Sequence, residues 1–113
     1  MPVLTVEWVG APPPDGLAQR LADAAGLALG TPPGRTWVRL RHLTPARYAE
    51  NDVVRAPEPV FVELLVRAPT DAPTVGRLTR ALARACDRSP EQVHVLVLPA
   101  AAGRMFFGGV PVE

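Results

Sequence analysis

In the first third of the chain, apolar residues follow a strand pattern, then a helical pattern, and then a second strand pattern. Residues 3–9, Val-Leu-Thr-Val-Glu-Trp-Val, are typical of a β-strand, and the glycine and three prolines of residues 10–14 end it. Apolar residues then recur at helical spacing at Leu17, Leu21, Ala24, Ala25, Ala28 and Leu29. We expect Asp15 to cap this helix and Gly30 to end it.

A second strand is predicted over residues 36–43, after the turn at residues 31–34. Because successive side chains of a strand point to opposite faces, Trp37, Arg39 and Arg41 share one face. Val38 and Leu40 share the other face, which we expect to pack against the helix. Residues 44–58 are mostly polar and are predicted to form a long loop.

The same order of elements starts again at Pro59. A strand over residues 59–66, a helix capped by Asp71, a turn at Ser89-Pro90 and a strand over residues 93–98 follow one another. Equivalent residues lie 57 positions apart without a gap, in the pairs Pro2/Pro59, Leu21/Leu78, Pro33/Pro90 and Val38/Val95. The chain is therefore predicted to be one domain, residues 1–113, made of two tandem βαβ units, 2–43 and 59–98, a connecting loop, 44–58, and a tail, 99–113.

A βαβ unit places its two strands parallel, with a right-handed helical crossover. Two such units predict an α+β fold with a four-stranded mixed sheet and both helices on one face. The opposite face then carries Trp37, Arg39 and Arg41 on one strand and His94, Leu96 and Leu98 on another. A half-apolar sheet face needs a cover, and in a chain this small we expect a second subunit to provide it.

Composition narrows the class of function. The net charge is +1 and the 12 basic residues are spread along the chain, so no nucleic-acid or anionic-membrane partner is expected. The single cysteine, Cys86, excludes an internal disulfide and is interpreted as a small apolar core residue. No run approaches the roughly 18 apolar residues of a membrane span, and no signal peptide is recognisable, so a cytoplasmic location is expected.

No metal or cofactor site is predicted. Two histidines, one cysteine and no clustered carboxylates do not supply a ligand set, and no glycine-rich loop precedes a helix as phosphate binding requires. The pair Gly108-Gly109 follows two phenylalanines and is interpreted as a turn.

Pro2 is the most specific chemical feature of the sequence. Initiator methionine is normally removed before a small residue, and removal converts the Pro2 nitrogen from an amide into a secondary amine. An α-amino group titrates at about 7.7–8.0, and burial or a nearby cation lowers its pKa. Such an amine can act as a base near neutral pH. If Met1 is retained, the nitrogen stays an amide, and a non-catalytic binding or structural role is the alternative.

The βαβ duplication opening with Met1-Pro2-Val3 resembles the fused two-unit branch of the tautomerase superfamily. The segments Ser89–Val95 and Gly103–Gly109 carry further likeness. The resemblance implies a homotrimer whose sheets form a barrel. It also implies a cofactor-independent enzyme in which the N-terminal proline moves a proton between carbon and oxygen of a small 2-oxo or 2-hydroxy-alkenoic acid.

Other residues carry over only in part. The resemblance implies that His94 faces the pocket of a neighbouring subunit and that Met105 or Phe106 forms an apolar wall. The family's loop arginine is replaced by the Ala11–Pro14 segment, and a lysine of the fused members is replaced by Thr31. Another cation is therefore needed for the substrate carboxylate.

Several side chains are candidates for the missing roles. Arg39, and after it Arg41, can hold a carboxylate or form interface ion pairs instead. Tyr48 and Asn51 of the loop can donate hydrogen bonds to an enolate oxygen or simply be solvated. His94 can polarise a carbonyl, relay a proton or serve as an interface residue. For hydration or dehalogenation of an unsaturated acid, Glu50 or Asp52 would have to activate water.

Overall fold

The computed structural model describes all residues, 1–113, and its elements follow the predicted order. In the first unit these are β1 (Val3–Val9), α1 (Leu17–Leu29) and β2 (Trp37–Leu43). In the second unit they are β3 (Val60–Leu65), α2 (Ala72–Cys86) and β4 (Val93–Val97). Short 3-10 helices at Pro45–Arg47 and Pro90–Gln92 and a small hairpin, β5 (Phe106–Phe107) with β6 (Val110–Pro111), complete the chain.

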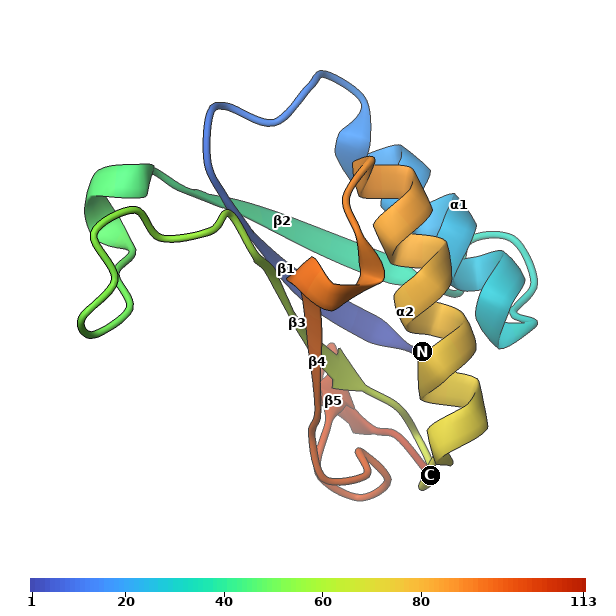
Figure 1. Ribbon diagram of the computed structural model, residues 1–113. Helices are drawn as coiled ribbons and strands as arrows, with labels where there is room; N and C mark the ends of the chain where they lie inside the picture. The colour runs from blue at the N-terminus through green and yellow to red at the C-terminus, as the bar shows by residue number, and fades with distance from the viewer.

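The four main strands form one mixed sheet in the order β2-β1-β3-β4. Strand β1 is parallel to β2, β3 is parallel to β4, and the two units meet where β1 runs antiparallel to β3. Both helices cover the same face of this sheet (Figure 1). The predicted fold class and the helical layer on one face are thus confirmed.

The hydrophobic core lies between the sheet and the two helices. Leu4 and Val6 of β1 are fully buried there, and so are Leu21 of α1 and its equivalent Leu78 of α2. Burial of each such side chain contributes about 1.5–3 kcal/mol. Cys86 lies in the same core and is 5% exposed, which confirms its interpretation as an apolar core residue.

The two helices begin differently. In α2 the Asp71 carboxylate accepts a hydrogen bond from the Thr74 amide at 2.9 Å, as predicted. The prediction that Asp15 caps α1 is wrong. The chain enters α1 through Gly16 at φ 81°, a left-handed conformation that a glycine adopts without strain, and no side chain caps the helix. Gly16, and not Asp15, therefore occupies the N-cap position, and the helix begins at Leu17.

The face of the sheet opposite the helices, called here the open face, carries the side chains expected from strand parity. Trp37, Arg39 and Arg41 lie on it from β2, and His94 and Leu96 from β4. Leu96 is 60% exposed, an unusual state for an apolar side chain in the middle of a strand. An uncovered surface of this kind is what an interface between subunits requires.

The tail folds back beside the end of β3. The Ala101 amide donates to the Val66 carbonyl at 2.8 Å, and the Ala102 amide donates to the Arg67 carbonyl at 3.2 Å. Gly108 and Gly109, at φ 57° and 84°, join β5 to β6, so the predicted turn is confirmed. Neither helix has the length and apolar character needed to cross a membrane.

Candidate functional site

The start of β1 lies between two arginines contributed by its neighbouring strands. In the sheet, Val3 is opposite Trp37 of β2 and opposite Leu65 of β3. Two residues further toward the amino end, the same registers place Met1 between Arg35 and Arg67. Arg35 precedes β2 in the turn after α1, and Arg67 follows the last residue of β3. Both cations therefore reach the first residue from opposite sides.

A cavity of about 240 Å³ opens at this place and is called here the N-terminal cavity. Its walls come from Met1, the two flanking arginines and Trp37, and the tail closes it with Phe107 and residues 110–113. The rings of Trp37 and Phe107 meet edge to face at 4.8 Å. Two cations and two aromatic rings thus surround the amino end of the chain.

Pro2 follows Met1, which lines this cavity, and is itself buried rather than part of the cavity wall. Its carbonyl oxygen accepts a hydrogen bond from the Trp37 amide at 3.0 Å, which continues the β1–β2 ladder by one residue. This hydrogen bond holds the backbone of Pro2 in the sheet, and it therefore fixes the position at which the Met1 amine is attached.

The electrostatic environment disfavours a protonated amine. The pKa of the Met1 α-amino group is lowered, first by burial and then by the positive charges of Arg67 and Arg35. Neither arginine has a carboxylate partner within salt-bridge distance, although Glu113 lines the same cavity. The one ion pair of the chain lies elsewhere and joins Arg88 to Glu58 at 3.7 Å. Both guanidinium groups are free to bind an anionic ligand.

Arg39 and Arg41 lie on the open face, further along the sheet than the N-terminal cavity. The Arg39 Nη2 atom donates to Thr5 Oγ1 at 2.9 Å, and Arg41 is opposite Glu7 on β1. At about 3.3 Å per strand residue, Arg39 and Arg41 stand roughly 13 and 20 Å from the position of Arg35. Neither lines the cavity of its own subunit.

His94, Tyr48 and Asn51 lie at the opposite end of the sheet. Phe61 stands between the first two, with ring centroids 5.5 Å from His94 and 5.8 Å from Tyr48. The Tyr48 hydroxyl donates to Glu50 Oε2 at 2.6 Å, and this hydrogen bond is the main reason that the pKa of Tyr48 is raised. Asn51 is exposed in the loop. Within one subunit these groups cannot reach the amino end.

The two candidates from the tail, Met105 and Phe106, lie in different surroundings, and neither lines the N-terminal cavity. Met105 lines a separate cavity of about 240 Å³ together with Leu65 and Leu98, and Phe106 is 56% exposed. The next residue, Phe107, provides the aromatic wall of the N-terminal cavity instead. None of the residues singled out from the sequence as site residues lines this cavity, and Pro2 comes nearest to it as the chain neighbour of the lining residue Met1.

Arg35 and Arg67 were not recognised from the sequence, although a signal for them was present. Once two parallel strands and one antiparallel pair are predicted, the residues opposite Met1 follow from counting along the registers. Arg35 and Trp37 have the strand parity of Arg39, and Arg67 has the parity of Leu65. Finding the residues opposite Met1 in this way requires the pairing register of the strands, and the periodicity of the sequence does not give that register.

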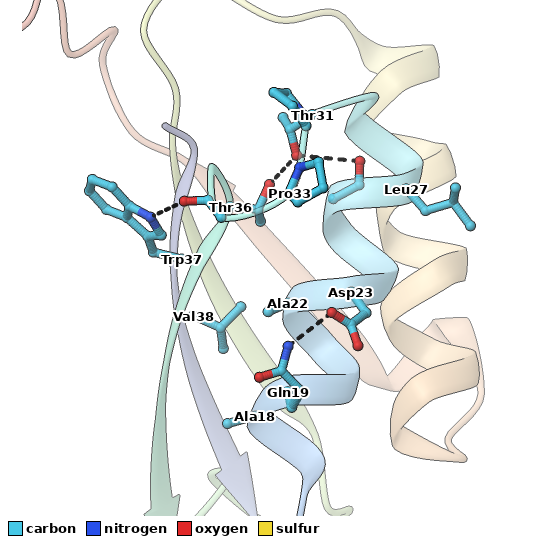
Figure 2. Close-up of a pocket in the computed structure, with 13 residues that line it drawn as sticks. Ala18, Gln19, Ala22, Asp23, Leu27, Thr31, Pro33, Thr36, Trp37 and Val38 are labelled. Atoms are coloured by element: carbon cyan, nitrogen blue, oxygen red, sulfur yellow. Dashed lines mark hydrogen bonds between the residues drawn. The ribbon is translucent and has the colours of Figure 1, made fainter.

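A larger groove, of about 650 Å³, lies between α1 and β2 (Figure 2). Its polar side chains are already hydrogen-bonded to one another or to the backbone: Gln19 donates to Asp23, Thr31 is bonded to Thr36, and the Trp37 indole donates to the Gly34 carbonyl. No cation lines it. The N-terminal cavity is therefore the stronger candidate for binding and chemistry.

The structure brings no group of three histidine, cysteine, aspartate or glutamate side chains close enough together to share a metal ion. The polar groups of the N-terminal cavity are an amine, two guanidinium groups and the carboxylate of Glu113. This set suits acid–base chemistry on an anionic molecule.

Neither a protein-family model nor a curated protein matches the sequence. Solved structures do match the fold. A wild-type fused 4-OT that forms an asymmetric trimer has a TM-score of 0.77 at 18% identity, covering 96% of this chain and 94% of its own. A malonate semialdehyde decarboxylase inhibited by 3-bromopropiolate has a TM-score of 0.73 at 16% identity, covering 94% and 88%. A macrophage migration inhibitory factor from Toxoplasma gondii has a TM-score of 0.74 at 16% identity, covering 96% and 98%.

Proposed function

Starting from the fold that this chain shares with fused two-unit proteins of the tautomerase superfamily, we propose that it is a cofactor-independent tautomerase or isomerase. Pro2, exposed by removal of Met1, is the general base. The substrate is a small 2-oxo or 2-hydroxy-alkenoic acid. The observation that carries the proposal is the position of the amino end in a cavity between two unpaired arginines.

The base is created by shortening the chain by one residue. Removal of Met1 moves the free amine to Pro2, one residue or about 3.3–3.6 Å of extended chain further into the end of the sheet. Burial and the charges of Arg67 and Arg35 already lower the pKa of the Met1 amine, and the same causes act on a Pro2 amine. A lower pKa increases the share of unprotonated amine near neutral pH, and this is the form that accepts a proton.

The two arginines have separate tasks in this mechanism. One guanidinium holds the substrate carboxylate in a bidentate contact, and the other faces the oxygen that becomes negatively charged as the enol forms or collapses. The Pro2 amine takes the proton from the enol hydroxyl at C2 and returns it to C3, the other carbon of the double bond, as the C2–C3 double bond becomes a C2 carbonyl. The 2-oxo acid leaves and the amine is regenerated. Trp37 and Phe107 exclude water and strengthen these charge interactions.

Assembly would complete the site. We expect the chain to form a homotrimer that covers the open face, which in a single subunit exposes Leu96 and Trp37. In such an assembly the end of the sheet bearing His94 and Tyr48 can approach the N-terminal cavity of a neighbour. This placement keeps the predicted contribution of His94 from the adjacent subunit, and it leaves Arg39 and Arg41 facing the interior of the assembly.

A non-catalytic member of the fold is the alternative. With Met1 in place, Met1 itself lines the N-terminal cavity and the Pro2 nitrogen is an amide without a basic lone pair. A protein that keeps Met1 would retain the fold and the two arginines as an anion-binding site, but it would lack the base.

Ketonisation of the enol of phenylpyruvate tests the proposed function. Protein whose intact mass shows the loss of Met1 is mixed with the enol, and the decay of its ultraviolet absorbance is followed against buffer. We expect saturable, enzyme-dependent decay that benzoate, a carboxylate without an enol, inhibits competitively. Decay at the buffer rate for this and related 2-hydroxy-alkenoic acids would exclude the proposed activity.

A further inference from the structure

A second cavity with unpaired cations lies on the outer side of the helical layer, far from the open face. It is a groove of about 600 Å³ between α1 and α2, called here the arginine groove. From α2 it is lined by Arg77, Arg80 and Arg84, at positions i, i+3 and i+7, with Ala81 and Ala85 between them. This spacing places the three guanidinium groups on one side of the helix.

The facing helix completes the groove with a different set of side chains. Arg20, Ala24 and Ala28 of α1 are the counterparts of Arg77, Ala81 and Ala85 in the internal repeat, 57 residues earlier. Equivalent residues of the two units therefore face each other across the groove. Its floor of four alanines is symmetric and shallow, and this lets the backbone of a third segment approach closely.

The two rims differ in charge. Asp23 of α1 is the counterpart of Arg80, and Leu27 of α1 is the counterpart of Arg84. The α2 rim consequently carries three positive charges, while the α1 rim carries one arginine, one aspartate and an 88% exposed leucine. Polarity across the groove distinguishes one orientation of a bound segment from the other.

The positive charges of the groove have no acidic partner within the chain. None of its four arginines forms a salt bridge, and the Asp23 carboxylate already accepts a hydrogen bond from Gln19 at 2.9 Å. Four of the 12 basic residues thus gather on one surface, three of them from α2 and one, Arg20, from α1. An electrostatic field of this kind attracts an acidic ligand.

We propose that the arginine groove binds an acidic amphipathic helix of a partner protein. Acidic side chains on one side of that helix pair with the guanidinium groups of the α2 rim. Its apolar side chains pack on the alanine floor and against Leu27, which is 88% exposed in the single subunit. A nucleic acid would use the charges but not the apolar floor, so the groove favours a peptide.

The proposed docking surface remains accessible in an assembly that buries the open face, because the helices cover the opposite face of the sheet (Figure 1). A trimer would display three such grooves, and a partner with several acidic helices would then bind with increased avidity. The proposal does not depend on the activity of the N-terminal cavity.

The test uses a fluorescein-labelled 18-residue helical peptide with a leucine stripe on one face and glutamates beside it. Fluorescence anisotropy measures its binding to full-length protein and to the triple variant Arg77→Gln, Arg80→Gln, Arg84→Gln. We expect the triple variant to bind about tenfold or more weakly, since charge pairs at a partly buried interface each contribute a measurable fraction of the affinity. The matched control, Arg47→Gln, Arg55→Gln, Arg104→Gln, removes the same charge elsewhere and should change the affinity less than about twofold.

Three further measurements test the partner class, the charge of the rim and the location of the binding surface. Leu27→Ser should weaken binding of the peptide but not of a single-stranded oligonucleotide with the same number of negative charges. The single variant Arg80→Asp, which copies the aspartate of the α1 rim, should reproduce most of the loss. Amide chemical shifts of α1 and α2 should move on addition of the peptide. Equal loss in the triple variant and its control, tighter binding of the oligonucleotide, or shifts confined to other elements would each overturn the proposal.

Discussion

Arg35 and Arg67 flank Met1 from opposite sides, one at the entrance of β2 and the other at the exit of β3. The arrangement follows from topology, because β1 is parallel to one neighbour and antiparallel to the other. The start of β1 therefore meets the start of β2 and the end of β3 at the same edge of the sheet. Two loops from different units thus deliver cations to the amine.

The first prediction concerns which arginine binds the substrate. Arg35→Ala and Arg67→Ala should each lower kcat/KM about 10- to 100-fold, since each removes a charge-assisted hydrogen bond of about 1.5–3 kcal/mol. Arg39→Ala serves as the control because the Arg39 guanidinium is bound to Thr5. Steady-state kinetics on one enol acid checks all three. If Arg39→Ala is the most damaging, the carboxylate is bound on the open face instead.

A second prediction concerns pH. A neutral amine is the active form, so kcat/KM should rise with pH through the pKa of the amine and then level off. The pKa of the Met1 amine is lowered first by burial and then by the charge of Arg67, and the proposed Pro2 amine lies one residue away. If Arg67 acts on it in the same way, Arg67→Ala should raise the pKa of the Pro2 amine and move the rise to higher pH. The pH profiles of trimmed wild type and variant make the comparison. An unmoved or acid-shifted profile would show that the titrating group is not this amine.

The edge-to-face contact of Trp37 with Phe107 predicts a specific role for the tail. Phe107→Ala removes an aromatic pair worth about 0.5–1.5 kcal/mol and opens the N-terminal cavity to water. Activity and the free energy of unfolding should both fall. The neighbouring Phe106→Ala is the control, because Phe106 is 56% exposed and should be nearly neutral. Urea denaturation and initial rates would reveal the opposite ranking if the prediction is wrong.

The open face predicts the oligomeric state. Sedimentation equilibrium should give three times the chain mass of 12.1 kDa. Leu96→Arg puts a charge in the middle of the face and should dissociate the assembly, since an unpaired buried charge is costly. Val54→Arg is the control, because Val54 is fully exposed in the connecting loop. A monomer at micromolar concentration in the wild type would contradict the proposed architecture.

Much of the fold was predictable because it depends on local patterns. Strand parity placed Trp37 and Arg39 on one face, and helical spacing placed Leu21 and Leu78 in the core. The cap of α1 was missed because Asp15 and Gly16 both suit a helix start, and only the backbone path decides between them. Local sequence does not contain that path.

The site was harder to predict because its members meet only through registers and packing. The cations at the amino end come from segments outside the regular strands, where parity was not applied. Phe107 rather than Phe106 reaches Trp37 because the hairpin turn sets which ring faces inward. The arginine groove likewise needs two helices placed side by side, which no single helical pattern shows.

The most direct test of the proposed mechanism compares two forms of one protein that differ only in Met1. The trimmed form is verified by intact mass, and the untrimmed form is made by blocking methionine removal. Both are assayed for ketonisation of the same enol acid at the same pH. The proposed mechanism predicts activity only in the trimmed form, because an amide nitrogen at Pro2 cannot accept the proton. Equal rates for the two forms would contradict the role of Pro2 as the base.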